Sequence, residues 1–215
     1  MGFFEYLQDR APVLTFGATQ HMSLVVQSLI ISTAVALLLA VLVYRTSTGA
    51  AVANAVSAVG LTLPSYAFLG ILVGVISLGV LPSVIALAFY GSLPILRNAV
   101  VGLRGVDPTL VESARGMGMN RFTTLWKLEI PLAWPVIMTG VRVSGQMLMG
   151  IAAIAAYVLG PGLGGFIFSG LSRLGGANAT YSVVAGTLGI IILAIILDII
   201  LNIVTKLTTS RGIRV

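Results

Sequence analysis

The sequence predicts an all-α membrane protein with five transmembrane helices. Hydrophobic residues make up 58% of the 215 positions, charged residues make up 8%, and the mean hydropathy is +1.08. Uncharged runs cover residues 22–44, 46–96, 143–172 and 174–197. A helix needs ~20 apolar residues to cross the hydrocarbon core, so the second run must hold two spans. Because the runs lack polar alternation, they do not fit the strands of an outer-membrane barrel.

The five expected spans are apolar segments bounded by charges or turn residues, at about 22–44, 51–77, 80–97, 133–158 and 180–204. Gly79 and Pro82 supply the turn between the second and third spans. Pro64 lies inside the second span and should kink it, because proline removes a helical hydrogen bond. We treat residues 1–215 as a single transmembrane domain.

The distribution of Lys and Arg predicts the orientation of the chain in the plasma membrane. With five spans, the termini lie on opposite sides, and a cytoplasmic C-terminus places nine cations inside: Arg45, Arg97, Arg104, Arg115, Arg121, Lys127, Lys206, Arg211 and Arg214. Only Arg10 and Arg173 then lie outside, which is a strong positive-inside bias. We expect the N-terminus outside. The net charge of +6 then reflects loops that face anionic membrane lipid, not a nucleic-acid partner.

A charged segment interrupts the apolar chain at about residues 104–131 and should lie in the cytoplasm. Asp107 and Pro108 suit the N-cap and the first position of a short helix, which Gly116 or Gly118 can end. Asn120 can cap a second short helix. The pattern alone also fits an amphipathic linker at the membrane surface.

The spacing within this segment favours a more specific interpretation. It resembles the EAA loop of ABC importer permeases in three features at fixed offsets: Glu112-Ser113-Ala114, Gly118, and Leu128-Glu129-Ile130-Pro131. Ser113 replaces the usual alanine. Four further segments are similar to the osmoprotectant subfamily, whose members import glycine betaine, carnitine and choline: residues 61–71, 91–119, 129–144 and 162–171.

The resemblance implies the type I ABC importer permease fold, with a cytoplasmic coupling helix between the third and fourth spans. It assigns contact with the ATPase to eight residues: Glu112, Ser113, Ala114, Arg115, Gly116, Met117, Gly118 and Met119. We expect Glu112 to anchor the short helix and Gly118 to permit its sharp exit. The implied partners are an ATP-binding-cassette ATPase, an extracellular solute-binding protein, and a second permease, either another copy or a homologue.

The chain carries no sign of its own catalytic chemistry. The lysines, Lys127 and Lys206, do not lie in a phosphate-binding loop, so ATP and Mg²⁺ are expected on the partner ATPase. We expect no cofactor, metal site or catalytic residue in this chain, and Cys is absent. The single histidine, His21, is expected to be an interfacial polar residue and not a ligand.

Four residues are expected to line the translocation pathway: Pro64, Ser65, Ser144 and Gln146. The glycine-rich stretch 160–176 is either a gate at the outer mouth or a flexible connection. Aromatic residues make up only 7% of the chain and suggest no obvious cage for a quaternary ammonium group.

Two opposite charges fall at similar depth in the last two spans. Arg142 lies eleven residues after Pro131, and Asp198 lies eight residues before Lys206. At 1.5 Å per residue both are ~12–16 Å from the cytoplasmic ends of their helices, so we predict an intramembrane ion pair. Alternatively, Arg142 caps carbonyls near the kinked second span, or Asp198 faces the pathway.

Three other interpretations stay open from the sequence. The same scaffold could serve another small zwitterionic or cationic solute, or an amino acid. An ion-coupled carrier would need acidic residues deep in the spans, and Asp198 is the only candidate. A scaffold that transports nothing is the third possibility.

Overall fold

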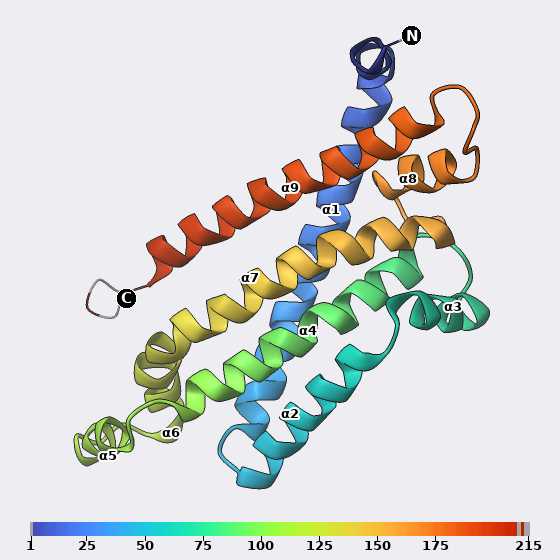
Figure 1. The fold of residues 1–215 in the computed structure, drawn as a ribbon. Coiled ribbons are helices and arrows are strands. Elements are labelled where there is room, and N and C mark those ends of the chain that lie inside the picture. Colours follow the sequence, from blue (N-terminus) through green and yellow to red (C-terminus); the bar gives the residue numbers. More distant parts are fainter. Residues whose placement is uncertain (1, 210–211, 213–215) are drawn as a thin grey trace.

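The computed structural model describes residues 2–209 and 212, and within them the elements are helices joined by short connections (Figure 1). Four helical segments are long and apolar enough to cross a membrane, or five if a bent helix pair counts as one span. The spans are α1 (Phe3–Val43), α4 (Val80–Arg104), α7 (Ile130–Ala155) with its flanking turns, α9 (Ala179–Thr208), and the bent pair α2 (Ser47–Thr62) and α3 (Ser65–Val75). The predicted all-α membrane fold is confirmed.

Helices α4 and α7 form the centre of the bundle (Figure 1). Helix α1 packs across both, α2 lies along α4, and α9 lies along α7. Gly140 permits the close approach of the two central helices, because a Cβ there would lie 3.0 Å from the Pro94 carbonyl oxygen. Ser144 adds a hydrogen bond of 2.7 Å to the Gly91 carbonyl. A substitution that adds a side chain at Gly140 would therefore push the two central helices apart.

The first helix begins well before the expected span. Helix α1 has 41 residues and starts at Phe3, not at residue 22. Exposed charges such as Asp9 and Arg10 are compatible with a helix that extends beyond the hydrocarbon core. The added turns are held by aromatic contacts, since Phe3 and Tyr6 both pack against Tyr181 of α9, with ring centroids about 6 Å apart.

The second expected span is interrupted at Pro64. Helices α2 and α3 meet there at 90°, so the proline ends one helix and caps the next instead of bending a continuous one. The interruption frees carbonyl groups of the last turn of α2. Tyr90 of α4 satisfies one of them by donating a 2.8 Å hydrogen bond to the Leu63 carbonyl.

The remaining boundaries are wider than expected. Helix α4 continues to Arg104, seven residues past its predicted end, and Pro94 is buried inside it. Helix α9 ends at Thr208. The fourth span continues directly from the charged segment through α6 (Arg121–Thr124) and the π-helical turn η1 (Leu125–Glu129), then ends in the 3₁₀ turn η2 (Ala156–Val158).

The bundle has two distinct ends. The coupling-loop end holds the short helix α5 (Pro108–Gly116), the end of α1 and the start of α2. The opposite end holds the start of α1, helix α3, and the short helix α8 (Gly164–Leu171) (Figure 1). Two of the nine cations that predict a cytoplasmic coupling-loop end, Arg211 and Arg214, lie outside the described residues.

Candidate functional site

Helix α5 has well-defined caps at both ends. The Asp107 carboxylate accepts a 2.8 Å hydrogen bond from the Thr109 amide. At the other end, Gly118 has a φ of +85°. Its amide donates to the Arg115 carbonyl, and the Met119 amide donates to the Ala114 carbonyl, which together form a Schellman motif. Any residue with a Cβ is strained at Gly118, so the sharp exit from the helix depends on glycine.

Most of the expected coupling residues lie on the surface of α5. Glu112, Ser113, Arg115, Gly116 and Met117 are exposed, whereas Ala114 is buried. The expected anchoring role of Glu112 is not found within this subunit: its carboxylate makes no ion pair among the described residues, and Asp107 holds the helix start instead.

Large apolar side chains are also exposed around this helix. Leu110, Met117, Phe122 and Trp126 expose between 45% and 74% of their surface. Exposed apolar groups beside charged ones are typical of a surface that binds another protein.

The segment after α5 positions a buried carboxylate. Asn120 caps α6 by accepting a 2.8 Å hydrogen bond from the Thr123 amide, but α6 is not a separate helix, because it runs on into η1. Glu129 is the last residue of the π-helical turn and is only 5% exposed. π-Helical turns occur often at functional sites, and this one places Glu129 against the end of α1.

Two residues at the end of α1 bind the Glu129 carboxylate. The Tyr44 hydroxyl donates a hydrogen bond of 2.5 Å, and the Arg45 guanidinium lies 3.4 Å away. Arg45 also donates a 2.6 Å hydrogen bond to the Tyr44 hydroxyl. Burial, together with the bond to Glu129, raises the pKa of Tyr44 to about 12, so the phenol stays protonated and can donate.

The two charges within the last spans lie together. The Arg142 guanidinium contacts both oxygens of the Asp198 carboxylate, at 2.9 and 3.1 Å, in a bidentate arrangement. Gln146 donates a further 3.0 Å hydrogen bond to Asp198. The Arg142 and Asp198 side chains remain 37% and 30% exposed in the isolated subunit. A polar cluster at this depth must therefore face another protein surface or water, not lipid.

The expected pathway residues have different environments. Pro64 and Gln146 are exposed, and Ser65 is half-buried. Ser144 is fully buried in the isolated subunit, where its hydroxyl donates a hydrogen bond to the Gly91 carbonyl of α4. Gln146 lies on an exposed stripe of α7 whose members recur every three or four residues: Thr139, Val143, Gln146 and Gly150. Tyr157, which is also exposed, follows seven residues later in η2.

An aromatic cluster at the opposite end was missed in the sequence. Tyr66 at the start of α3 and Tyr157 in η2 have ring centroids 4.8 Å apart, and Phe168 of α8 lies 5.7 Å from Tyr157. Both tyrosines are about half exposed. They are 91 positions apart in the chain, so no local pattern links them.

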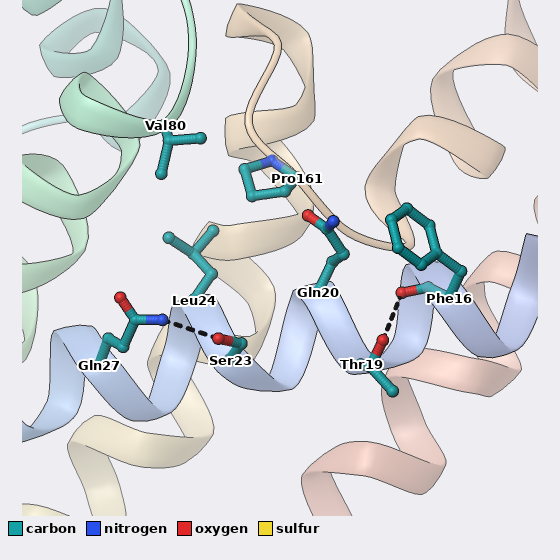
Figure 2. A pocket seen from close by; sticks show the side chains of 8 residues that line it. All are labelled: Phe16, Thr19, Gln20, Ser23, Leu24, Gln27, Val80 and Pro161. Atoms are coloured by element: carbon teal, nitrogen blue, oxygen red, sulfur yellow. Dashed lines mark hydrogen bonds between the residues drawn. The ribbon is translucent and has the colours of Figure 1, made fainter.

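A hollow of about 410 Å³ opens beside α1 near the same end (Figure 2). Thr19, Gln20, Ser23 and Gln27 give it a polar wall, and Gln27 donates a 2.7 Å hydrogen bond to Ser23. Phe16 and Leu24 of α1, Val80 of α4 and Pro161 complete the lining (Figure 2). The first span thus carries a polar face within an uncharged run.

The glycine-rich stretch 160–176 is packed, not extended. Helix α8 lies against α9, and Ser182 donates a 2.8 Å hydrogen bond to the Phe166 carbonyl. A Cβ at Gly164 would collide with the Ala153 carbonyl oxygen.

His21 was expected to be an interfacial polar residue, but it is fully buried beside Gly162. Its Nε2 lies 3.2 Å from the Met149 carbonyl oxygen. No group of three potential metal ligands occurs in the part of the chain that the structure describes.

Comparison with known protein families shows to which family this chain belongs. Residues 28–210 match the family described as "Binding-protein-dependent transport system inner membrane component". The chain belongs to this family. The match covers the spans from mid-α1 to the end of α9 and includes the whole coupling segment.

Several curated relatives align over nearly their full length. The choline transport system permease protein OpuBB of Bacillus subtilis is 35% identical over 98% of this chain and 95% of its own length. The glycine betaine/carnitine/choline transport system permease protein OpuCB of Bacillus subtilis is 34% identical, covering 97% of this chain and 94% of its own. The osmoprotectant import permease protein OsmW of Salmonella typhimurium is 35% identical over 100% of both.

Solved structures share the fold. Inward-facing MetNI, a methionine ABC transporter, contains a chain that matches with a TM-score of 0.78 at 18% identity, covering 94% of this chain and 99% of that one. This likeness confirms the type I importer permease fold.

Proposed function

We propose that this chain is the membrane subunit of an ABC importer for a small osmoprotectant such as choline, glycine betaine or carnitine. The observation that carries the proposal is the alignment over nearly the whole chain, at 34–35% identity, with permeases that bear these names. The segment whose spacing resembles the EAA loop of such permeases forms a capped short helix, α5, with an exposed charged surface, and this supports the proposal.

In the proposed transporter, separate subunits hydrolyse ATP, deliver the solute and form the pathway with this chain. A separate ATPase binds ATP and Mg²⁺ and docks on α5, where Glu112, Arg115 and Met117 are exposed. A solute-binding protein delivers the substrate at the opposite end, outside the cell. A second permease, identical or homologous, covers the exposed stripe of α7, because Gln146 and its bonded charges do not fit a lipid-facing surface.

The stripe of α7 also indicates where the solute would pass. It leads from Thr139 through Gln146 and Gly150 to Tyr157, which lies beside Tyr66 at the interruption between α2 and α3. An interrupted helix is tolerated at membrane depth where it lines a cavity or is covered by protein. Exposed tyrosine faces attract quaternary ammonium groups. These features fit a pathway for a trimethylammonium solute.

Reconstitution tests the proposal. The permease is purified with its cognate ATPase and binding protein, and ATP hydrolysis is measured with choline, glycine betaine, carnitine, methionine and histidine in turn. We expect hydrolysis to rise with binding protein plus one of the three trimethylammonium solutes. Stimulation only by an amino acid would contradict the substrate class, and no association with an ATPase would contradict the importer.

A further inference from the structure

The coupling helix has few contacts of its own with the membrane bundle. Among the described elements, α5 packs mainly against α6, and a cleft of about 310 Å³ separates it from the corner between α1 and α2. Any movement of α5 must therefore reach the spans through the two ends of its loop. The structure shows what holds those ends.

Both ends of the loop hold the same corner. At the entry, Arg104 in the last turn of α4 donates two 3.1 Å hydrogen bonds, one to the Tyr44 carbonyl and one to the Thr46 carbonyl. At the exit, Glu129 accepts the hydrogen bond from the Tyr44 hydroxyl and pairs with Arg45. The chain thus contacts residues 44–46 from two positions 25 residues apart, on either side of α5.

Arg45 adds a third connection. Besides Glu129, its guanidinium reaches the carbonyl of Arg121 in α6 at 3.3 Å. The Arg45 side chain at the end of α1 therefore contacts both ends of the segment that follows α5: the Arg121 carbonyl at its start and the Glu129 carboxylate at its end. A planar guanidinium with several donors suits such a junction, which a lysine could not reproduce.

The carboxylate is an expensive group to bury if its only role is to stabilise the fold. Replacing a buried ion pair by packed apolar side chains is often neutral or stabilising. Glu129 nevertheless lies in a π-helical turn, where the rotated backbone directs it to Tyr44 and Arg45. The arrangement fixes one register between the loop exit and α1.

We propose that Glu129, Tyr44 and Arg45 form a clamp that transmits movement of the coupling helix to α1 and α2. The clamp residues are positioning residues: they touch neither ATP nor solute. Because both ends of the loop are tied to the α1–α2 corner, displacement of α5 by a docked ATPase displaces this corner as well. The inference rests on the proposed function, since it assumes that an ATPase moves α5.

The test compares solute import with ATP hydrolysis in the complete reconstituted transporter. Glu129→Gln removes the charge but keeps an acceptor for Tyr44, and Tyr44→Phe removes only the hydroxyl. We expect each variant to lower the amount of solute imported per ATP about tenfold, the effect of one charge-assisted hydrogen bond, while ATP hydrolysis stays within about twofold of wild type. Asp9→Asn, which neutralises an exposed carboxylate paired with Arg10, is the matched control and should leave the ratio unchanged.

A covalent replacement keeps the proposal testable if a single variant folds poorly. The chain has no cysteine, so Tyr44→Cys and Glu129→Cys can be combined without background. The uncrosslinked double variant should be uncoupled, and a short bifunctional thiol reagent that joins the two positions should restore import per ATP. Restoration supports the clamp. Three results would overturn it. The amount of solute imported per ATP could stay unchanged in every variant, hydrolysis and import could fall in parallel, or the crosslink could inactivate the transporter. Failure of the wild-type transporter to import any solute would instead contradict the proposed function.

Discussion

Breaking the ion pair between Arg142 and Asp198 should destabilise the subunit, and the size of this loss of stability can be calculated from the structure. Asp198→Asn removes the charge that Arg142 contacts at 2.9 and 3.1 Å. Breaking a buried pair costs ~3–5 kcal/mol, and an unpaired arginine at mid-membrane costs ~2.5–3.5 kcal/mol on insertion scales. Since about a third of each side chain is exposed, screening reduces the expected loss to ~2–3 kcal/mol.

The assay is the thermal stability and folded yield of the purified subunit. A loss of this size should lower the melting temperature on the order of 5–10 °C in a chain of 215 residues. Arg142→Gln should have a similar effect. The double variant should recover at least about half of the loss, because two amides can hydrogen-bond and the coupling energy of contacting residues is ~0.5–3 kcal/mol.

The control is the exposed pair Asp9–Arg10, which is 55–62% exposed with a separation of 3.4 Å. Neutralising it should change stability by less than ~0.5 kcal/mol. The reasoning is refuted if Asp198→Asn and Arg142→Gln each lower the stability no more than this control does. It is also refuted if the stability loss of the double variant equals the sum of the two single losses. Normal stability with selectively weakened uptake in Asp198→Asn would instead assign Asp198 to the solute pathway.

Three further predictions concern topology, coupling and the solute. Cysteines introduced at Gly2 and Ala177 should react with an impermeant reagent added outside intact cells, and one at Thr109 should not; the reverse pattern would contradict the charge bias. Gly118→Val should strain the exit of α5, where φ is +85°, and abolish most import while the subunit still inserts; normal import per ATP would show that this glycine is incidental. Tyr157→Leu should raise the KM for a trimethylammonium solute ~2–5-fold while Tyr157→Phe should not, and equal effects would exclude a cation–π contact.

Features set by local composition were predictable from the sequence. Uncharged runs located the spans because hydrocarbon excludes charge, and the caps at Asp107 and Gly118 follow from single residues with strong preferences. Depth along a helix follows from the fixed rise per residue. Counting residues from the helix ends beside the coupling loop is therefore enough to place Arg142 and Asp198 at one level.

Features set by tertiary contacts were not predictable. The start of α1 was missed because charges near the N-terminus obscured a helix that extends past the membrane and packs on Tyr181. The clamp was missed because Tyr44 and Glu129 are 85 positions apart, and nothing in the sequence reveals that residues 125–129 adopt a π-helical turn. The hydrogen bond from Ser144 to α4 was not predictable, because a serine in a span can equally face a pathway or bond a neighbouring helix.

The central claim is that this chain carries a trimethylammonium osmoprotectant across the membrane at the expense of ATP hydrolysed by a partner. The direct measurement is uptake of radiolabelled choline, glycine betaine and carnitine into proteoliposomes that contain the permease and its ATPase, with binding protein on the outside and ATP inside. The account predicts uptake of at least one of these solutes that stops when ATP or binding protein is omitted. Uptake driven by an ion gradient without ATP, or ATP-dependent uptake of amino acids alone, would contradict it.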